Sequence, residues 1–311
     1  MTITQIEYIV AVDEYQNFAL AAKNCGVTQP TLSMQVKKLE EDLGVIIFDR
    51  SKKPVMATEI GSQVIQHAKT TLMGFNQIRD IIQESESEMK GELKIGIIPT
   101  LSPYLLPLFI LNFTQKYPAV RVKVEELLSE QIMDRLKDDH LDAGILATPL
   151  NDNELIEDPM FYEAFVVYMS TAHPLSETNQ VNFSDLDLKD MWLLKEGHCF
   201  RNQAVNICTD AQDKNESHIQ FESGSLETLR NIVDHEYGYT LLPELAMLSL
   251  EDSKQSFIKH FKDPRPVREI GLITHRTSLK KKLIEALRSE IINVVPKNML
   301  DKQRGRLVEW R

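Results

Sequence analysis

The sequence predicts a chain in three successive parts: a small helical module with one strand pair, a single long helix, and an α/β domain. Residues 17–44 contain two short helical segments separated by a glycine, which is typical of a compact helical module. Residues 59–89 carry apolar side chains at steps of three and four, which indicates one long helix. From residue 92 onward, strand patterns alternate with helical patterns, which indicates an α/β fold.

The composition limits the class of protein. Hydrophobic residues make up 42% and charged residues 26% of the 311 residues, as in an ordinary globular protein. We find no apolar run of about 18 residues and no basic segment of a signal peptide, so we expect a cytoplasmic protein without a membrane span. The net charge of −11 argues against a protein that coats nucleic acid, but it allows one small DNA-binding module. We expect neither a metal nor a cofactor.

Residues 1–58 are predicted to form a winged helix-turn-helix. After a first amphipathic helix, Asn17 and Thr28 are suited to cap two short helices, and Gly26 lies in the turn between them. Pro30 follows in the first turn of the second helix, where its missing N–H costs nothing. The inward-facing positions of that helix are Leu32, Val36 and Leu39.

The outward face of this second helix carries side chains suited to DNA. Glutamine, serine and threonine at the start of a helix reach base edges in a major groove, and lysines meet phosphates. The outward-facing residues are Gln29, Thr31, Ser33, Met34, Gln35, Lys37 and Lys38.

Residues 45–61 indicate a short strand pair, a wing, with Arg50, Lys52 and Lys53 at its tip. A helical domain with a charged loop would show a similar pattern. Residues 1–58 hold six basic and seven acidic side chains, so the positive charge is only local. We therefore expect DNA affinity to need a dimer and more than one half-site.

Residues 59–91 are predicted to be a linker. The stripe of its helix comprises Ile60, Val64, Ala68, Leu72, Phe75, Ile78 and Ile82. We expect the stripe to pair with a second copy in a dimer, the alternative being packing against its own domain. The polar stretch ESESEMKGE, residues 84–92, is the predicted hinge.

The stretch ALAAKNCGVTQPTLSMQVKKLEEDLGV, followed by IIFDR, closely resembles the N-terminal signature of LysR-type transcriptional regulators. The resemblance implies that Gln29, Pro30, Thr31, Ser33 and Gln35 face DNA and that Arg50 holds its backbone. It also implies a C-terminal sensor of type 2 periplasmic-binding-protein architecture, and assembly into a homotetramer that is a dimer of dimers.

Residues 92–311 are predicted to be that sensor, with subdomain I at about 92–163 and 268–295 and subdomain II at about 164–267. Strands are expected at GELKIGIIPT, VRVKVEEL, DAGIL, AFVVYMS, MWLLKEG, HIQFES and REIGLITH, and the helix SLKKKLIEALRSEIINVV closes the domain. Because ligands bind at the carboxyl ends of strands in such sheets, Thr100 and Ser129 are candidates to line a cleft, although either can be a helix cap. We assign no role to the tail, residues 296–311.

Cys199 and Cys208 lie nine residues apart in one polar stretch. If the stretch after His198 is a helix, its N–H groups and dipole favour a Cys199 thiolate, and Arg201 adds positive charge. Nine residues of helix rise roughly 13 Å, whereas a disulfide needs Cα atoms about 4.4–6.8 Å apart. Bridging therefore requires unwinding. The alternative is two unrelated cysteines, one buried and one exposed. We expect the third cysteine, Cys25, to be buried and inert.

The chain resembles the OxyR family, the hydrogen-peroxide sensors among LysR-type regulators. The resemblance lies in EGHC followed by Arg201, in the second cysteine, Cys208, and in SLETLRN at residues 225–231. IGIIPTLSPYLLP and GYTLLPELA also match its pattern. The resemblance implies that Cys199 is the peroxidatic cysteine and Cys208 the resolving one. It places the peroxide pocket at Thr100, Ser129, His198, His218 and Arg268, and we expect Arg201 to belong to it as well. His218 can instead be a strand histidine with a structural partner.

These observations predict a DNA-binding activator of antioxidant genes that senses hydrogen peroxide. A thiolate attacks one peroxide oxygen, and the leaving oxygen needs a donor such as Thr100, His198 or His218. Arg268 can hold the thiolate and the sulfenate, and the sulfenic acid then condenses with a nearby thiol. We expect the change to recruit RNA polymerase at promoter DNA, and the thioredoxin or glutaredoxin system to reverse it.

Two other functions are open. One is a LysR-type regulator of a small-molecule metabolite, with incidental cysteines. The other is a thiol peroxidase, but a catalyst needs no DNA-binding module. We therefore expect no enzyme.

Overall fold

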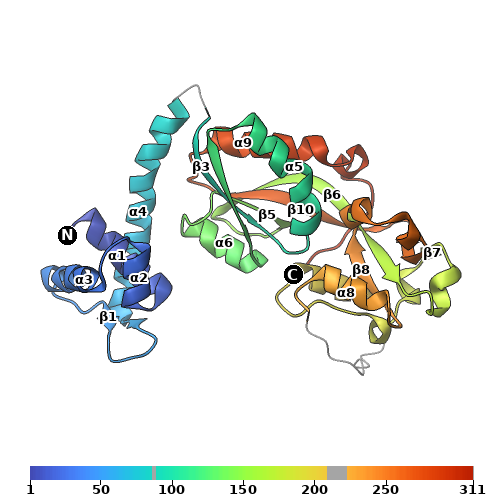
Figure 1. Cartoon of the computed structure of the whole chain (residues 1–311), viewed down its shortest axis with the longest axis horizontal. Coiled ribbons are helices and arrows are strands. Elements are labelled where there is room, and N and C mark those ends of the chain that lie inside the picture. Colours follow the sequence, from blue (N-terminus) through green and yellow to red (C-terminus); the bar gives the residue numbers. More distant parts are fainter. Residues whose placement is uncertain (86–88, 209–222, 311) are drawn as a thin grey trace. The chain divides into compact units, whose positions relative to one another are not determined.

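The computed structural model describes residues 1–85, 89–208 and 223–310. Contacts divide the chain into two compact units, Met1–Ser85 and Glu86–Arg311 (Figure 1). Among the described residues, no helix combines the length and the apolar character needed to cross a membrane.

The first unit begins with the predicted winged helix-turn-helix. Its elements are α1 (Ile3–Tyr15), α2 (Phe18–Asn24), α3 (Gln29–Leu43), β1 (Phe48–Asp49) and β2 (Met56–Ala57), and the two strands pair antiparallel as the wing. The predicted caps are confirmed: Asn17 Oδ1 accepts the first N–H groups of α2, and Thr28 Oγ1 accepts the Thr31 N–H. Gly26 has a left-handed φ of +67° in the turn.

Helix α4 (Glu59–Ser85) follows directly. Its first part packs on α1, because Ala68 is buried in the shared core and Lys69 pairs with Asp13 at 3.3 Å. Ile60 and Ile78 expose 45% and 57% of their surface, and the side chain of Ile82 lies outside the described residues. Part of the predicted stripe therefore packs within its own unit, and pairing of the remainder with a second copy stays a prediction.

The second unit is the predicted α/β domain. Its first subdomain contains β3 (Gly91–Ile97), α5 (Ser102–Lys116), β4 (Val120–Glu126), α6 (Ser129–Lys137), β5 (Ala143–Thr148) and α9 (Lys281–Val294). The sheet runs β4-β3-β5-β10-β6, with β3 parallel to β4 and β5 (Figure 1). The long strands β6 (Leu155–Met169) and β10 (Pro266–His275) pair antiparallel and continue toward the second subdomain.

The second subdomain is built on the far half of β6. Strands β8 (Tyr239–Pro243) and β9 (Ile258–Phe261) pair with β6, and β7 (Gln180–Val181) pairs with β9. Its helices are α7 (Cys199–Cys208) and α8 (Leu226–Val233). Short 3-10 helices complete the unit: η1 (Pro174–Glu177), η2 (Phe183–Asp185), η3 (Leu188–Asp190), η4 (Glu244–Ser249), η5 (Asp252–Phe257) and η6 (Lys297–Leu300).

The predicted strand at residues 191–197 is wrong. Only Met191 and Leu194 form isolated bridges, to Tyr239 and Ser223. The segment leaves the 3-10 helix η3 and ends at Gly197, whose φ of +92° cannot continue a strand ladder. Of the other predicted strand, residues 218–223, all but the last residue lie outside the described part of the chain.

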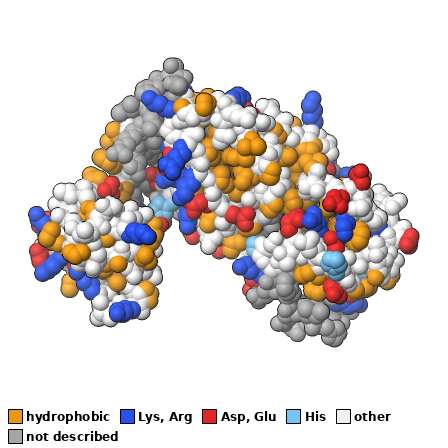
Figure 2. Space-filling view, in the orientation of Figure 1, with side chains coloured by type: hydrophobic (Ala, Val, Ile, Leu, Met, Phe, Trp, Pro, Cys, Tyr) orange, Lys and Arg blue, Asp and Glu red, His pale blue; other side chains and the backbone are white. Residues whose placement is uncertain are grey.

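The surface of the second unit includes an apolar area over α5. Figure 2 shows hydrophobic side chains gathered on the face where Figure 1 places this helix. Leu111 on α5 exposes 68% of its surface. The exposed side of this helix is therefore partly apolar.

Candidate functional site

The residues predicted to meet DNA lie on α3 and on the wing. The exposed ones are Gln29, Pro30, Thr31 and Lys37 on α3, and Arg50, Lys52 and Lys53 on the wing. Ser33 and Gln35 are half-buried: Arg50 donates to Ser33 Oγ at 3.3 Å, and Gln5 donates to Gln35 Oε1 at 3.2 Å. The start of α3 thus presents polar side chains that neighbouring residues partly orient.

Glu40 ties the wing to α3. Its carboxylate accepts the backbone N–H groups of Ile47 and Phe48 at 2.8 and 3.1 Å, and it pairs with Arg50 at 2.9 Å. The Arg50 charge is therefore partly neutralised within the module. Lys53, by contrast, makes no ion pair within the described ranges, so its charge is available to a DNA phosphate.

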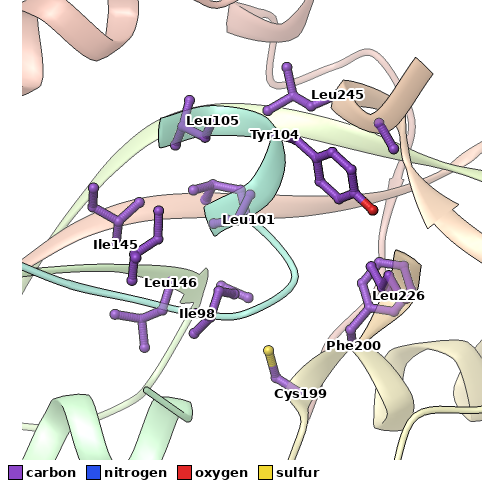
Figure 3. Close-up of a cluster of buried hydrophobic side chains, with 14 of the residues drawn as sticks. Ile98, Leu101, Tyr104, Leu105, Ile145, Leu146, Cys199, Phe200, Leu226 and Leu245 are labelled. Atoms are coloured by element: carbon purple, nitrogen blue, oxygen red, sulfur yellow. The ribbon is translucent and has the colours of Figure 1, made fainter. Parts of the chain in front are cut away.

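In the second unit, Cys199 is the first residue of α7 and a buried free thiol. Two residues before Cys199, the chain turns at Gly197, which has a φ of +92°. Glycine suits this position because a Cβ there would also lie only 3.2 Å from the Leu128 side chain, next to the start of α6. Figure 3 shows the Cys199 sulfur pointing toward the buried cluster that includes Ile98. The predicted helix with Cys199 at its N-terminus is confirmed.

Arg268, on β10, supplies a buried positive charge at this site. It is fully buried and pairs with Glu163, its register partner on β6, at 2.8 Å. It donates to Thr100 Oγ1 at 3.0 Å and to the Thr100 carbonyl at 3.2 Å, and its guanidinium carbon lies 4.8 Å from the Phe200 ring centre. Because Thr100 Oγ1 accepts from Arg268, its own hydroxyl hydrogen is available to another group.

The Cys199 thiol is surrounded by groups that stabilise its anion, although burial opposes ionisation. Burial raises the pKa of Cys199, whereas the Arg268 charge, the Ser129 hydroxyl and the Phe200 N–H lower it. The raising effect is the larger, so the resting group is a thiol. The N–H groups at the start of α7 lower the pKa of Cys199, as expected, but burial of the charge has the larger effect.

The positive charge that acts on Cys199 comes from Arg268 rather than from Arg201. Arg201 Nη1 donates to the Leu194 carbonyl at 2.8 Å and so ties α7 to the segment that precedes it. His218 lies outside the described residues.

Ser129 and His198 each bury a polar atom that has no well-formed hydrogen bond among the described residues, Ser129 Oγ and His198 Nε2. Ser129 Oγ lies close enough to Cys199 to lower the pKa of that thiol. Burial, with a smaller effect of Lys195, lowers the pKa of His198 and keeps it neutral. An unpaired buried polar atom costs free energy, so the two atoms indicate a place for a small polar ligand or water.

Cys208 is the last residue of α7 and is fully buried. Burial raises the pKa of Cys208 to about 12, and the neighbouring Tyr239 hydroxyl lowers it only partly. That hydroxyl also donates to the Asp187 carbonyl at 2.8 Å. The intact helix holds the two cysteines roughly 13 Å apart, beyond the reach of a disulfide.

Cys25, the third cysteine, is half-buried rather than buried as predicted, because it ends α2 beside the exposed turn at Gly26. Burial and the charges of Glu7 and Glu14 raise the pKa of Cys25, which disfavours its reactive thiolate.

Each of the two units matches a known protein family. Residues 3–62 match the bacterial regulatory helix-turn-helix protein, lysR family, and residues 86–295 match the LysR substrate binding domain. This chain belongs to the LysR family. It is therefore a DNA-binding transcriptional regulator and not an enzyme, and its second unit has the two-subdomain, periplasmic-binding-protein-like fold of that family.

Individual relatives cover nearly the whole chain. The hydrogen peroxide-inducible genes activator of Haemophilus influenzae is 36% identical over 97% of this chain and 99% of its own length. The DNA-binding transcriptional dual regulator OxyR of Escherichia coli K12 is 35% identical over 94% and 96%. Among solved structures, full-length OxyR C199D from Pseudomonas aeruginosa matches with a TM-score of 0.76 and 33% identity over 95% of this chain and 99% of that chain.

Two residues of this regulator's site were not predicted. Glu163 is a fully buried carboxylate within the apolar run of residues 159–169 of β6, and that isolated acid was the signal for a buried cation partner. Tyr239 gave no signal, because an aromatic residue in an apolar strand usually only packs.

Proposed function

We propose that this LysR-type regulator senses hydrogen peroxide through Cys199 and activates antioxidant genes when oxidised. The observation that carries the proposal is one buried cysteine beside Arg268 and Ser129, with Cys208 at the far end of the same helix. The similarity to regulators named as peroxide-inducible activators supports the same sensing function.

The chemistry follows from the groups at Cys199. The thiol loses its proton, and its sulfur attacks one peroxide oxygen as the O–O bond breaks. The leaving oxygen takes up the proton, so that thiol and peroxide become sulfenic acid and water. Arg268 and Ser129 stabilise the anionic sulfur, while the Thr100 hydroxyl and the neutral His198 ring are donors for the leaving oxygen.

The second step joins the cysteines. The Cys208 thiol attacks the sulfenic sulfur, the S–S bond forms, the S–O bond breaks, and water leaves. Because α7 keeps the two sulfur atoms apart, residues 199–208 must unwind for this step. The two-electron oxidation thereby becomes a change of shape.

The change of shape acts on the assembly and on DNA. We propose a homotetramer, a dimer of dimers, in which refolding of residues 199–208 alters the contacts between second units. The exposed apolar surface of α5 supports such contacts. The altered spacing of the DNA-binding modules on promoter DNA then recruits RNA polymerase, and the thioredoxin or glutaredoxin system reduces the disulfide.

A thiol count tests the proposal. One equivalent of peroxide should remove two thiols from the wild-type protein, none from Cys199→Ser, and two from the control Cys25→Ser. Cys208→Ser should stop at a sulfenic acid that dimedone traps, as mass spectrometry would detect. Unchanged thiols in the wild-type protein at micromolar peroxide would contradict the proposal.

A further inference from the structure

The C-terminal tail, residues 296–310, lies along the strand that carries Arg268. Its strand β11 (Arg306–Leu307) pairs in parallel with the start of β10. The Arg306 N–H donates to the Arg265 carbonyl at 2.8 Å, and the Val308 N–H donates to the Val267 carbonyl at 2.9 Å. One edge of the tail is therefore fixed directly beside residue 268.

The same tail is held by the polar face of α7. Asn202 Nδ2, Gln203 Nε2 and Asn206 Nδ2 donate to the backbone carbonyls of Trp310, Val308 and Glu309 at 3.1, 2.8 and 3.1 Å. The three donors occupy positions i, i+1 and i+4, which lie on one side of a helix. This match between donors and carbonyls exists only while α7 is helical.

Both ends of the tail are anchored. Trp310 is buried, and its Nε1 donates to the Pro149 carbonyl at 3.2 Å. Arg304 pairs with Glu244 at 2.8 Å and donates to the Tyr162 carbonyl at 3.0 Å. The tail thus forms a strip fixed between the strand of Arg268 and the helix of Cys199.

We propose that the C-terminal tail positions α7, and that its docking sets how readily the Cys199–Cys208 disulfide forms. This inference rests on the proposed function. Closing the disulfide unwinds α7 and must break the three tail hydrogen bonds. Because the tail binds only the helical form, it stabilises the reduced protein, and oxidation must in turn release the tail.

The decisive measurement is the reduction potential of the disulfide in Asn202→Ala/Asn206→Ala. Losing two hydrogen bonds should favour the disulfide about tenfold, which makes the potential about 30 mV more negative. Alanine favours the helix and hence the reduced form, so helix propensity cannot produce this result. A matched control, Asn112→Ala/Asn231→Ala, changes two exposed helical asparagines on α5 and α8 and should keep the wild-type potential.

Trp310 gives a second readout in the intact protein. In a Trp192→Phe background, where Trp310 is the remaining tryptophan, oxidation should shift its fluorescence to longer wavelength as the tail leaves its site. A disulfide that forms while Trp310 stays buried, with equal potentials in both double variants, overturns the tail's role alone. A wild-type protein that forms no disulfide overturns the proposed function as well.

Discussion

Replacing Arg268 with methionine is expected to destabilise the second unit strongly. Glu163 would stay fully buried without its cation, and Thr100 would lose two hydrogen bonds. Removing one partner of a buried ion pair costs about 3–5 kcal/mol. Since each kcal/mol lowers the melting temperature of a domain of this size by roughly 2–4 °C, we expect a fall of about 6–20 °C.

The double variant Glu163→Met/Arg268→Met separates stability from chemistry. Replacing both members of a buried pair with apolar residues of similar volume is often neutral or stabilising, so most of the lost stability should return. The peroxide reaction should not recover, because the Arg268 charge that lowers the pKa of Cys199 is still missing. Its pH–rate profile should move to higher pH, and each unit of displacement should lower the rate at pH 7 about tenfold.

Thermal unfolding and stopped-flow oxidation between pH 6 and 9 measure the two effects on the same samples. We expect low stability and slow reaction in the single variant, and restored stability with slow reaction in the double variant. A double variant that reacts at the wild-type rate would show that Arg268 serves only the fold.

Three further predictions concern other parts of the chain. Gly197→Ala places a Cβ on a residue with φ +92°, 3.2 Å from Leu128, so the free energy of unfolding measured in urea should fall by about 1–3 kcal/mol. The control Gly74→Ala changes an exposed glycine without such a neighbour and should leave the stability unchanged. Lys53→Ala should weaken DNA binding equally across sequences and reduce the slope of log affinity against log salt by about 1; a changed sequence preference would contradict a phosphate contact. Burial lowers the pKa of His173 and His198 below the ordinary 6.5. Because the unfolded chain then binds more protons than the folded one, the free energy of unfolding should fall as the pH drops from 7 to 5.5. A His173→Asn/His198→Asn variant with the wild-type pH dependence would refute this.

The fold of the first unit could be predicted because its signals are local. Asn17, Gly26 and Thr28 act on neighbouring backbone groups, and the 3.6-residue period places Leu32 and Val36 in the core without knowledge of any distant residue. Strands β3 and β4 were predicted for the same reason, since alternation along one segment marks each of them.

The candidate site was only partly predictable, because its essential contacts join distant segments. Glu163 and Arg268 become neighbours through strand pairing, and the tail reaches α7 across about a hundred residues of chain. The raised pKa of Cys199 has the same origin: it depends on how deeply the surrounding fold buries the sulfur, which a helix-end argument does not include. Residues 191–197 look like a strand but lack a continuous partner.

The stability of α7 links the two steps of the proposed mechanism. Isolated helices shorter than ~12–15 residues are marginal in water, so the ten residues of α7 are held by their surroundings rather than by their own hydrogen bonds. Phe200 packs on Phe165 with ring centres 5.0 Å apart and lies against Arg268. On the other side of α7, Asn202 and Asn206 hold the tail. The proposed unwinding of α7 would move Phe200 away from Arg268 and so remove the positive charge that lowers the pKa of Cys199 from its place beside the thiol. In the proposed mechanism, peroxide attack therefore requires the helical state and disulfide closure the unwound one. Each contact that stabilises α7 should then favour the first step and oppose the second.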